Sequence, residues 1–113
     1  MIDDLAQTIA RVATRVKGGI LIFFPSYKLM NDMYDRWCRS GGLQEILKSK
    51  DVYREPKEAA EYQLIIDRYY SAIYEDEKKG AILMGVCRGR ISEGLDFSDN
   101  AARMVIIIGI PFP

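Results

Sequence analysis

Three short apolar runs constrain the fold of this 113-residue chain more than any other feature. They cover residues 20–24, 81–86 and 104–108, and each is too short for a helix of ordinary length. Runs of this kind are typical of strands that are buried on both faces of a parallel sheet. The sequence between them follows helical periodicity. We therefore predict one α/β domain over residues 1–113, in which helices cover a mainly parallel sheet.

Apolar side chains spaced three and four residues apart predict the helices. The first helix ends at Gly18-Gly19, and a second one, capped by Ser26, ends at Gly41-Gly42. A long helix is expected over residues 57–75. Residues 43–56 have a weaker pattern, from which we expect a helical turn and then a short strand. The inward-facing side chains of the helices are predicted to be Leu5, Ile9, Val12, Val16, Met30, Met33, Tyr34, Trp37, Tyr62, Ile66, Tyr69 and Ile73.

The composition excludes several kinds of site. The chain has no histidine, which removes Ser-His-Asp and Cys-His catalysis and histidine metal sites. Cys38 and Cys87 match no metal-binding spacing, so we expect free thiols. Because 16 basic residues balance 16 acidic ones, a site for a polyanion has to be a local arrangement. No apolar run reaches the length of about 18 residues that a membrane span needs, so no membrane partner is expected.

The polar stretch from Cys87 to Asp99 follows the second apolar run and suits the chemistry of nucleotides. Arginine binds phosphate through a planar fork, glycine lets a backbone approach phosphate closely, and Asp96 can accept a hydrogen bond from a ribose hydroxyl. Alternatively, the glycines only form a turn and the arginines make surface ion pairs with Glu93 and Asp99. There is no GxGxxG or GxxxxGK[ST] loop, so this chain cannot hold the phosphates of ATP by itself.

A second polar loop, Pro25-Ser26-Tyr27, follows the first apolar run. Its hydroxyl and ring can contact the phosphate or the base of a nucleic-acid strand. Equally, Ser26 can serve only as a helix cap, and Tyr27 only as the edge of the core. Both loops are expected at the carboxyl ends of parallel strands, where α/β sheets bind their ligands.

Two segments together resemble motifs IV and V of the XPD-like (Rad3-related) superfamily 2 DNA helicases. They are FFPSY at residues 23–27 and VCRGRISEGLDFSD at residues 86–99, and Glu55-Pro56 and IPFP at residues 110–113 belong to the same pattern. The likeness is greatest to the Fanconi anaemia J-type and telomere-elongation-regulator branch, and it covers about residues 18–113. It implies a RecA-like three-layer domain, the second motor domain of an ATP-dependent helicase, truncated at its C-terminal end.

The resemblance also implies roles for single residues. Glu93 and Asp96 would be catalytic, with Glu93 coupling the ATP site to DNA. Gly94 and Asp96 would bind the nucleotide, Asp96 through its ribose. Contacts to single-stranded DNA are implied for Ser26, Tyr27, Arg88 and Ser92.

The cofactors and partners follow from the same resemblance. ATP and Mg²⁺ would be shared with the first RecA-like domain of the same parent protein. The parent, but not this chain, would hold an iron–sulfur cluster, step along single-stranded DNA from 5′ to 3′, and work in the nucleus. The isolated chain is expected to be inactive, since it has no phosphate loop. A non-catalytic RecA-like interaction module is the alternative, because the phosphate-binding motifs are absent from this sequence.

Overall fold

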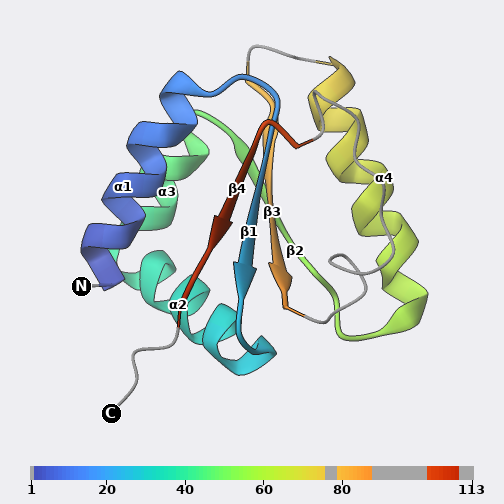
Figure 1. The fold of residues 1–113 in the computed structure, drawn as a ribbon, viewed down its shortest axis with the longest axis horizontal. Coiled ribbons are helices and arrows are strands. Elements are labelled where there is room, and N and C mark those ends of the chain that lie inside the picture. The colour runs from blue at the N-terminus through green and yellow to red at the C-terminus, as the bar shows by residue number, and fades with distance from the viewer. Residues whose placement is uncertain (1, 76–78, 88–101, 110–113) are drawn as a thin grey trace.

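The structure, a computed structural model, describes residues 2–75, 79–87 and 102–109 (Figure 1). Helical and extended segments alternate along these residues, as the hydrophobic pattern predicts. The helices are α1 (Ile2–Arg15), α2 (Tyr27–Ser40), α3 (Gly42–Leu47) and α4 (Ala59–Glu75). The strands are β1 (Gly19–Phe24), β2 (Asp51–Arg54), β3 (Ala81–Val86) and β4 (Met104–Ile107).

The strands form a parallel sheet in the order β2-β3-β1-β4. Helices α1, α2 and α3 cover one face of this sheet and α4 covers the other, which gives three layers (Figure 1). The prediction of a RecA-like three-layer α/β domain with a mainly parallel sheet is therefore confirmed. The carboxyl ends of β1, β3 and β4 point to the lower edge of Figure 1.

The core has two parts, one on each face of the sheet. Phe24 and Trp37 belong to the part under α1–α3, whereas Leu21 and Tyr69 belong to the part under α4. Strand β1 contributes to both parts because its successive side chains point to opposite faces. Burial on both faces removes the need for polar positions, which explains why β1 and β3 are apolar throughout.

Helix α1 packs through smaller residues than the sequence predicts. Its fully buried side chains are Ala6, Ile9 and Ala13, while Val12 is half-buried. A Cβ atom added to Gly42 in α3 would lie 2.8 Å from Cβ of Ala6. Because the two helices approach so closely, a small side chain occupies this contact. Of the predicted stripe, Ile9 is fully buried, and Leu5, Val12 and Val16 are partly buried and pack against the same core.

Strand β4 differs from its prediction. Its pattern predicts burial on both faces, but Val105 is 52% exposed and Ile107 is 70% exposed. The prediction is wrong because β4 lies at the edge of the described sheet, whereas α4 packs against β2 and β3. Helix α4 also begins at Ala59, two residues later than predicted, and Tyr62 on it is only half-buried.

The amino ends of the strands are joined by backbone contacts around two glycines. Gly18 and Gly80 both have positive φ angles, of 79° and 71°. The carbonyl oxygen of Gly18 accepts hydrogen bonds from the Ala81 amide at 3.2 Å and from the fully buried Lys50 side chain at 3.1 Å. Lys50 also donates to the carbonyl of Lys79. This edge of the sheet is therefore occupied by structural contacts, and the opposite edge carries the predicted site.

Candidate nucleic-acid interface

The two predicted ligand loops leave neighbouring strands at the same level. Phe24, the last residue of β1, is paired with Val86, the last residue of β3. Directly after them, the amide of Cys87 donates a 2.8 Å hydrogen bond to the carbonyl oxygen of Phe24. The carboxyl edge of the sheet thus brings together the start of both loops, although they are some 60 residues apart in the sequence.

Ser26 caps helix α2, as its position in the sequence predicts. Its backbone is extended, and its Oγ accepts a 3.1 Å hydrogen bond from the amide of Leu29. The hydroxyl group is the acceptor in this hydrogen bond, so its own proton can still be donated, and the residue is exposed. Ser26 can therefore cap the helix and still donate to a ligand, so its contact with DNA stays a prediction.

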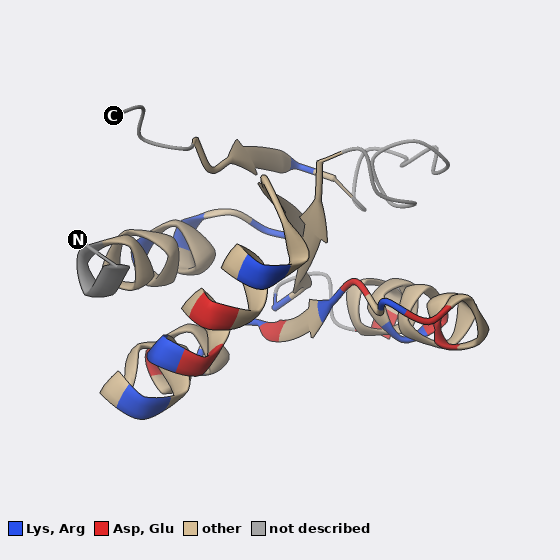
Figure 2. Ribbon diagram, turned by 90° about the horizontal axis from the view of Figure 1, so that it is seen from below, with Lys and Arg blue, Asp and Glu red and all other residues tan. Residues whose placement is uncertain are grey.

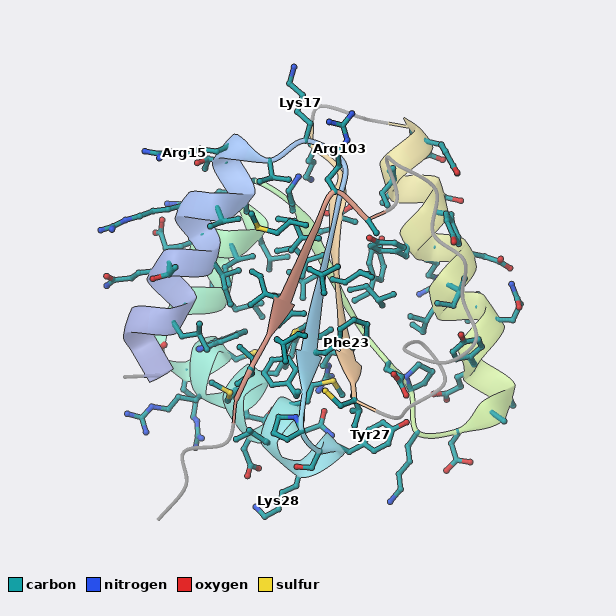
Figure 3. All side chains as sticks on the ribbon, in the orientation of Figure 1. Arg15, Lys17, Phe23, Tyr27, Lys28 and Arg103 are labelled. Atoms are coloured by element: carbon teal, nitrogen blue, oxygen red, sulfur yellow. The ribbon has the colours of Figure 1, made fainter. Side chains whose placement is uncertain are left out.

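Tyr27 is half-buried at the start of α2, and its ring reaches toward β2. The hydroxyl donates a 2.6 Å hydrogen bond to Oε2 of Glu55, which is only 3% exposed. Figure 3 labels Tyr27 and Lys28 at the carboxyl edge, opposite Arg15, Lys17 and Arg103 at the amino edge. The hydroxyl of Tyr27 is therefore held by a protein carboxyl group, and its contact with DNA stays a prediction.

A hollow of about 390 Å³ lies beside Tyr27. Arg54 is held on its wall by two contacts: its guanidinium lies 3.9 Å from the centre of the Tyr34 ring, and Nη1 donates to Oδ1 of Asn31 at 3.0 Å. Lys57 adds a second cation. The lining consists of Tyr27, Asn31, Tyr34, Val52, Tyr53, Arg54, Glu55, Pro56, Lys57, Glu61 and Ile65. Aromatic rings beside cations are the groups that single-stranded nucleic acids contact.

The charges around this hollow are mixed. Figure 2, seen from below Figure 1, shows basic and acidic residues interspersed along α2 and along the segment that leads from β2 to α4. Lys28 and Asp32 form an exposed ion pair at 2.7 Å, which raises the pKa of Lys28 through the hydrogen bond and the charge of Asp32. Burial, with a smaller effect of Asp51, raises the pKa of the Tyr53 phenol above its ordinary value. The lining of the hollow therefore combines the cations Arg54 and Lys57 with the carboxyl groups of Glu55 and Glu61.

The predicted motif V residues lie outside the described residues. They are Arg88, Ser92, Glu93, Gly94 and Asp96, so their roles stay predictions. Cys87, the last described residue before this segment, is a half-buried free thiol, and Cys38 is an exposed one.

Among the described residues, no group of three or more Cys, Asp or Glu side chains is arranged to hold a metal ion. Within the same residues, no helix has the length and apolar character needed to cross a membrane.

Two residues of this region escaped sequence reasoning. Glu55 belongs to the helicase-like pattern as part of Glu55-Pro56, but the sequence analysis assigns it no role. Arg54 is the second residue, and the sequence analysis does not single it out. Charged residues at the carboxyl end of a short strand in an α/β fold, Arg54 as the last residue of β2 and Glu55 directly after it, are the signal that could have pointed to both.

The parallel sheet, with helices on both faces and two loops at its carboxyl edge, places the chain in the class of open α/β domains that bind their ligands at that edge. Residues 9–113 match the family described as the helicase C-terminal domain, and the chain belongs to this family.

Relatives of known name agree with this assignment. The chain is 45% identical to the regulator of telomere elongation helicase 1 homolog of Drosophila melanogaster and 41% identical to that of Aedes aegypti. Both alignments cover 99% of this chain and 11% of the relative. The resemblance to the telomere-elongation-regulator branch of the XPD-like helicases is confirmed, and the chain spans about a tenth of the length of these relatives.

Proposed function

We propose that this chain is part of a longer ATP-dependent DNA helicase that moves along single-stranded DNA in the 5′ to 3′ direction. In this proposal, the carboxyl edge of the sheet forms one wall of the ATP site and part of the DNA path. The observation that carries it is the meeting of the two loops at this edge, where Cys87 donates to Phe24. Membership of the helicase C-terminal domain family and the helicase names of the relatives support it.

The proposed mechanism divides the work between the loops. Single-stranded DNA is held mainly through its backbone, so that binding is independent of base sequence. The residues that hold it are Ser26, Tyr27, Arg88 and Ser92. Gly94 and Asp96 orient the nucleotide, and Glu93 links its state to the DNA contacts. ATP with Mg²⁺, held between this domain and a first motor domain, supplies the free energy of each step. Because both loops start from adjacent strands, a movement at one is passed directly to the other.

The cellular setting is proposed on the relatives alone. Their names refer to telomere elongation, which takes place on chromosomes, so we propose a nuclear protein. The iron–sulfur cluster is proposed for another part of the protein.

The test of the proposed function is ATP hydrolysis by the full-length protein with and without a single-stranded oligonucleotide. We expect the oligonucleotide to stimulate hydrolysis. A well-folded protein that hydrolyses no ATP in either condition would contradict the proposal and favour a non-catalytic interaction module.

Arg88→Ala is expected to weaken single-strand binding by one phosphate contact. For single strands, each contact contributes a slope of about −0.7 to the dependence of log K on log salt concentration. The slope measured by fluorescence anisotropy should therefore become shallower by about 0.7. Arg103→Ala is the matched control, since Arg103 is exposed at the opposite edge of the sheet (Figure 3). An unchanged slope in Arg88→Ala would place the phosphate contact on another residue.

A further inference from the structure

Glu55 is a buried acidic residue at the carboxyl edge of the sheet, between the two predicted ligand loops. It follows the last residue of β2, and its amide donates a 2.7 Å hydrogen bond to the carbonyl oxygen of Met84. Among the described residues, Glu55 and Lys50 are the buried charged side chains, and Lys50 lies at the opposite edge. Burial of a carboxyl group is unfavourable unless its oxygens are hydrogen-bonded.

Both oxygens of Glu55 accept hydrogen bonds, and the donors belong to different elements. Oε2 accepts from the Tyr27 hydroxyl at 2.6 Å, and Oε1 accepts from the Val86 amide at 3.2 Å. Tyr27 begins α2 in the first loop region, and Val86 ends β3, one residue before Cys87. One carboxyl group therefore connects the two places where the predicted loops start.

Strand β3 leaves room for the Glu55 carboxyl group at Gly85. A Cβ atom added to Gly85 would lie 3.3 Å from Oε1 of Glu55 and 3.1 Å from the ring of Phe23. Both distances are shorter than ordinary contacts between carbon and its neighbours. The glycine next to the carboxyl end of this otherwise apolar strand therefore suits the space that the carboxyl group and the Phe23 ring require.

We propose that Glu55 is a positioning residue that holds Tyr27 and the exit of β3 in a fixed arrangement, and so aligns the two loops that contact single-stranded DNA and nucleotide. The inference rests on the proposed function for the identity of these ligands. The alignment itself concerns this chain's own hydrogen bonds. Glu55 acts through Tyr27 and Val86, not by touching DNA.

The sign of the effect on DNA binding separates positioning from electrostatics. If Glu55 acted only through its charge, Glu55→Gln would remove a negative group near the strand and strengthen binding of the polyanion. If Glu55 positions Tyr27, the carbonyl oxygen of glutamine can still accept from Val86, but its NH₂ group can only donate to the Tyr27 oxygen. The strong charge-assisted hydrogen bond from Tyr27 is then replaced by a weaker one, and binding weakens. Because a hydrogen bond to a charged group is lost, the Kd for a single-stranded oligonucleotide should rise about tenfold.

Two further variants in the full-length protein complete the experiment. Glu61→Gln removes an exposed negative charge from the same hollow and should leave the Kd unchanged or lower it. Tyr27→Phe keeps the ring but removes the hydroxyl, and it should raise the Kd by a factor similar to that of Glu55→Gln. Combined with Glu55→Gln, it should add little, since both changes remove the same charge-assisted hydrogen bond between Tyr27 and Glu55. Tighter binding by Glu55→Gln, or fully additive effects, would overturn the proposal.

A second measurement is independent of DNA. Hydrogen exchange of the Val86 amide should be faster in Glu55→Gln than in the wild type, because a neutral amide oxygen is a weaker acceptor than a carboxylate oxygen. It should be faster in Tyr27→Phe as well, although Tyr27 donates to the other oxygen. Glu61→Gln should leave it unchanged. Unchanged exchange in both test variants would overturn the positioning role. If the wild type bound no single-stranded DNA while exchange still responded, the proposed function would be wrong and the alignment by Glu55 would stand.

Discussion

Gly80→Ala is expected to unfold this domain or leave it barely stable. A Cβ atom at Gly80 would lie 1.9 Å from the carbonyl oxygen of Gly18 and 2.6 Å from its carbonyl carbon. These are backbone atoms of the turn that leads into β1, so they cannot rotate away as a flexible side chain could. The φ angle of 71° adds strain of about 1–2 kcal/mol for any residue with a side chain.

The total destabilisation should exceed about 4 kcal/mol. A domain of this size is stable by only about 5–15 kcal/mol, so the loss is a large part of the whole. The measurement is the urea midpoint for unfolding of this domain within the full-length protein, monitored by pulse proteolysis.

Two other glycines separate the causes of this effect. Gly41 has a φ angle of 89° but no atom within 4 Å of an added Cβ, so Gly41→Ala should cost only the strain, about 1–2 kcal/mol. Gly109 has neither the positive φ angle nor a neighbour within 4 Å, and Gly109→Ala should be nearly neutral. If Gly80→Ala were no worse than Gly41→Ala, the close approach of Gly18 and Gly80 would be wrong.

Asp96→Ala is expected to abolish DNA-stimulated ATP turnover by the full-length protein. In the proposed function, Asp96 orients the nucleotide through its ribose. Loss of that orientation reduces turnover by on the order of 100-fold or more. The measurement is phosphate release at saturating single-stranded DNA, wild type beside variant.

Asp99→Ala is the matched control, because it removes the same charge from the same polar stretch, at a position to which the resemblance assigns no role. Both variants should unfold at the wild-type urea concentration. Wild-type turnover in a folded Asp96→Ala protein would remove Asp96 from the nucleotide site.

The local sequence patterns determine most of the fold. Short apolar runs bounded by glycine or polar residues become β1 and β3, and Ser26 and Gly41 mark the ends of α2. These features depend on residues close in the chain, whose periodicity and capping groups are visible without the tertiary structure. The weaker pattern of residues 43–56 also correctly predicts α3 and β2.

Burial at the edges of the structure could not be predicted in this way. The run at β4 resembles those of β1 and β3, yet its alternate side chains are exposed because of its place in the strand order. In α1, Ala6 is fully buried where Gly42 of α3 approaches closely, whereas Val12 of the predicted stripe is only partly buried. A hydrophobic pattern reports which residues tolerate burial, but it does not report which neighbours are present.

The sequence by itself determined the α/β class, the parallel sheet, the resemblance to XPD-like helicases and the two loops of the candidate site. Only the tertiary structure placed Glu55 between Tyr27 and Val86 and stacked Arg54 on Tyr34. Partners separated by about 20 to 31 residues meet only after the strands have taken their order in the sheet. No periodicity or local motif encodes such a meeting, because it depends on the packing of whole elements against one another.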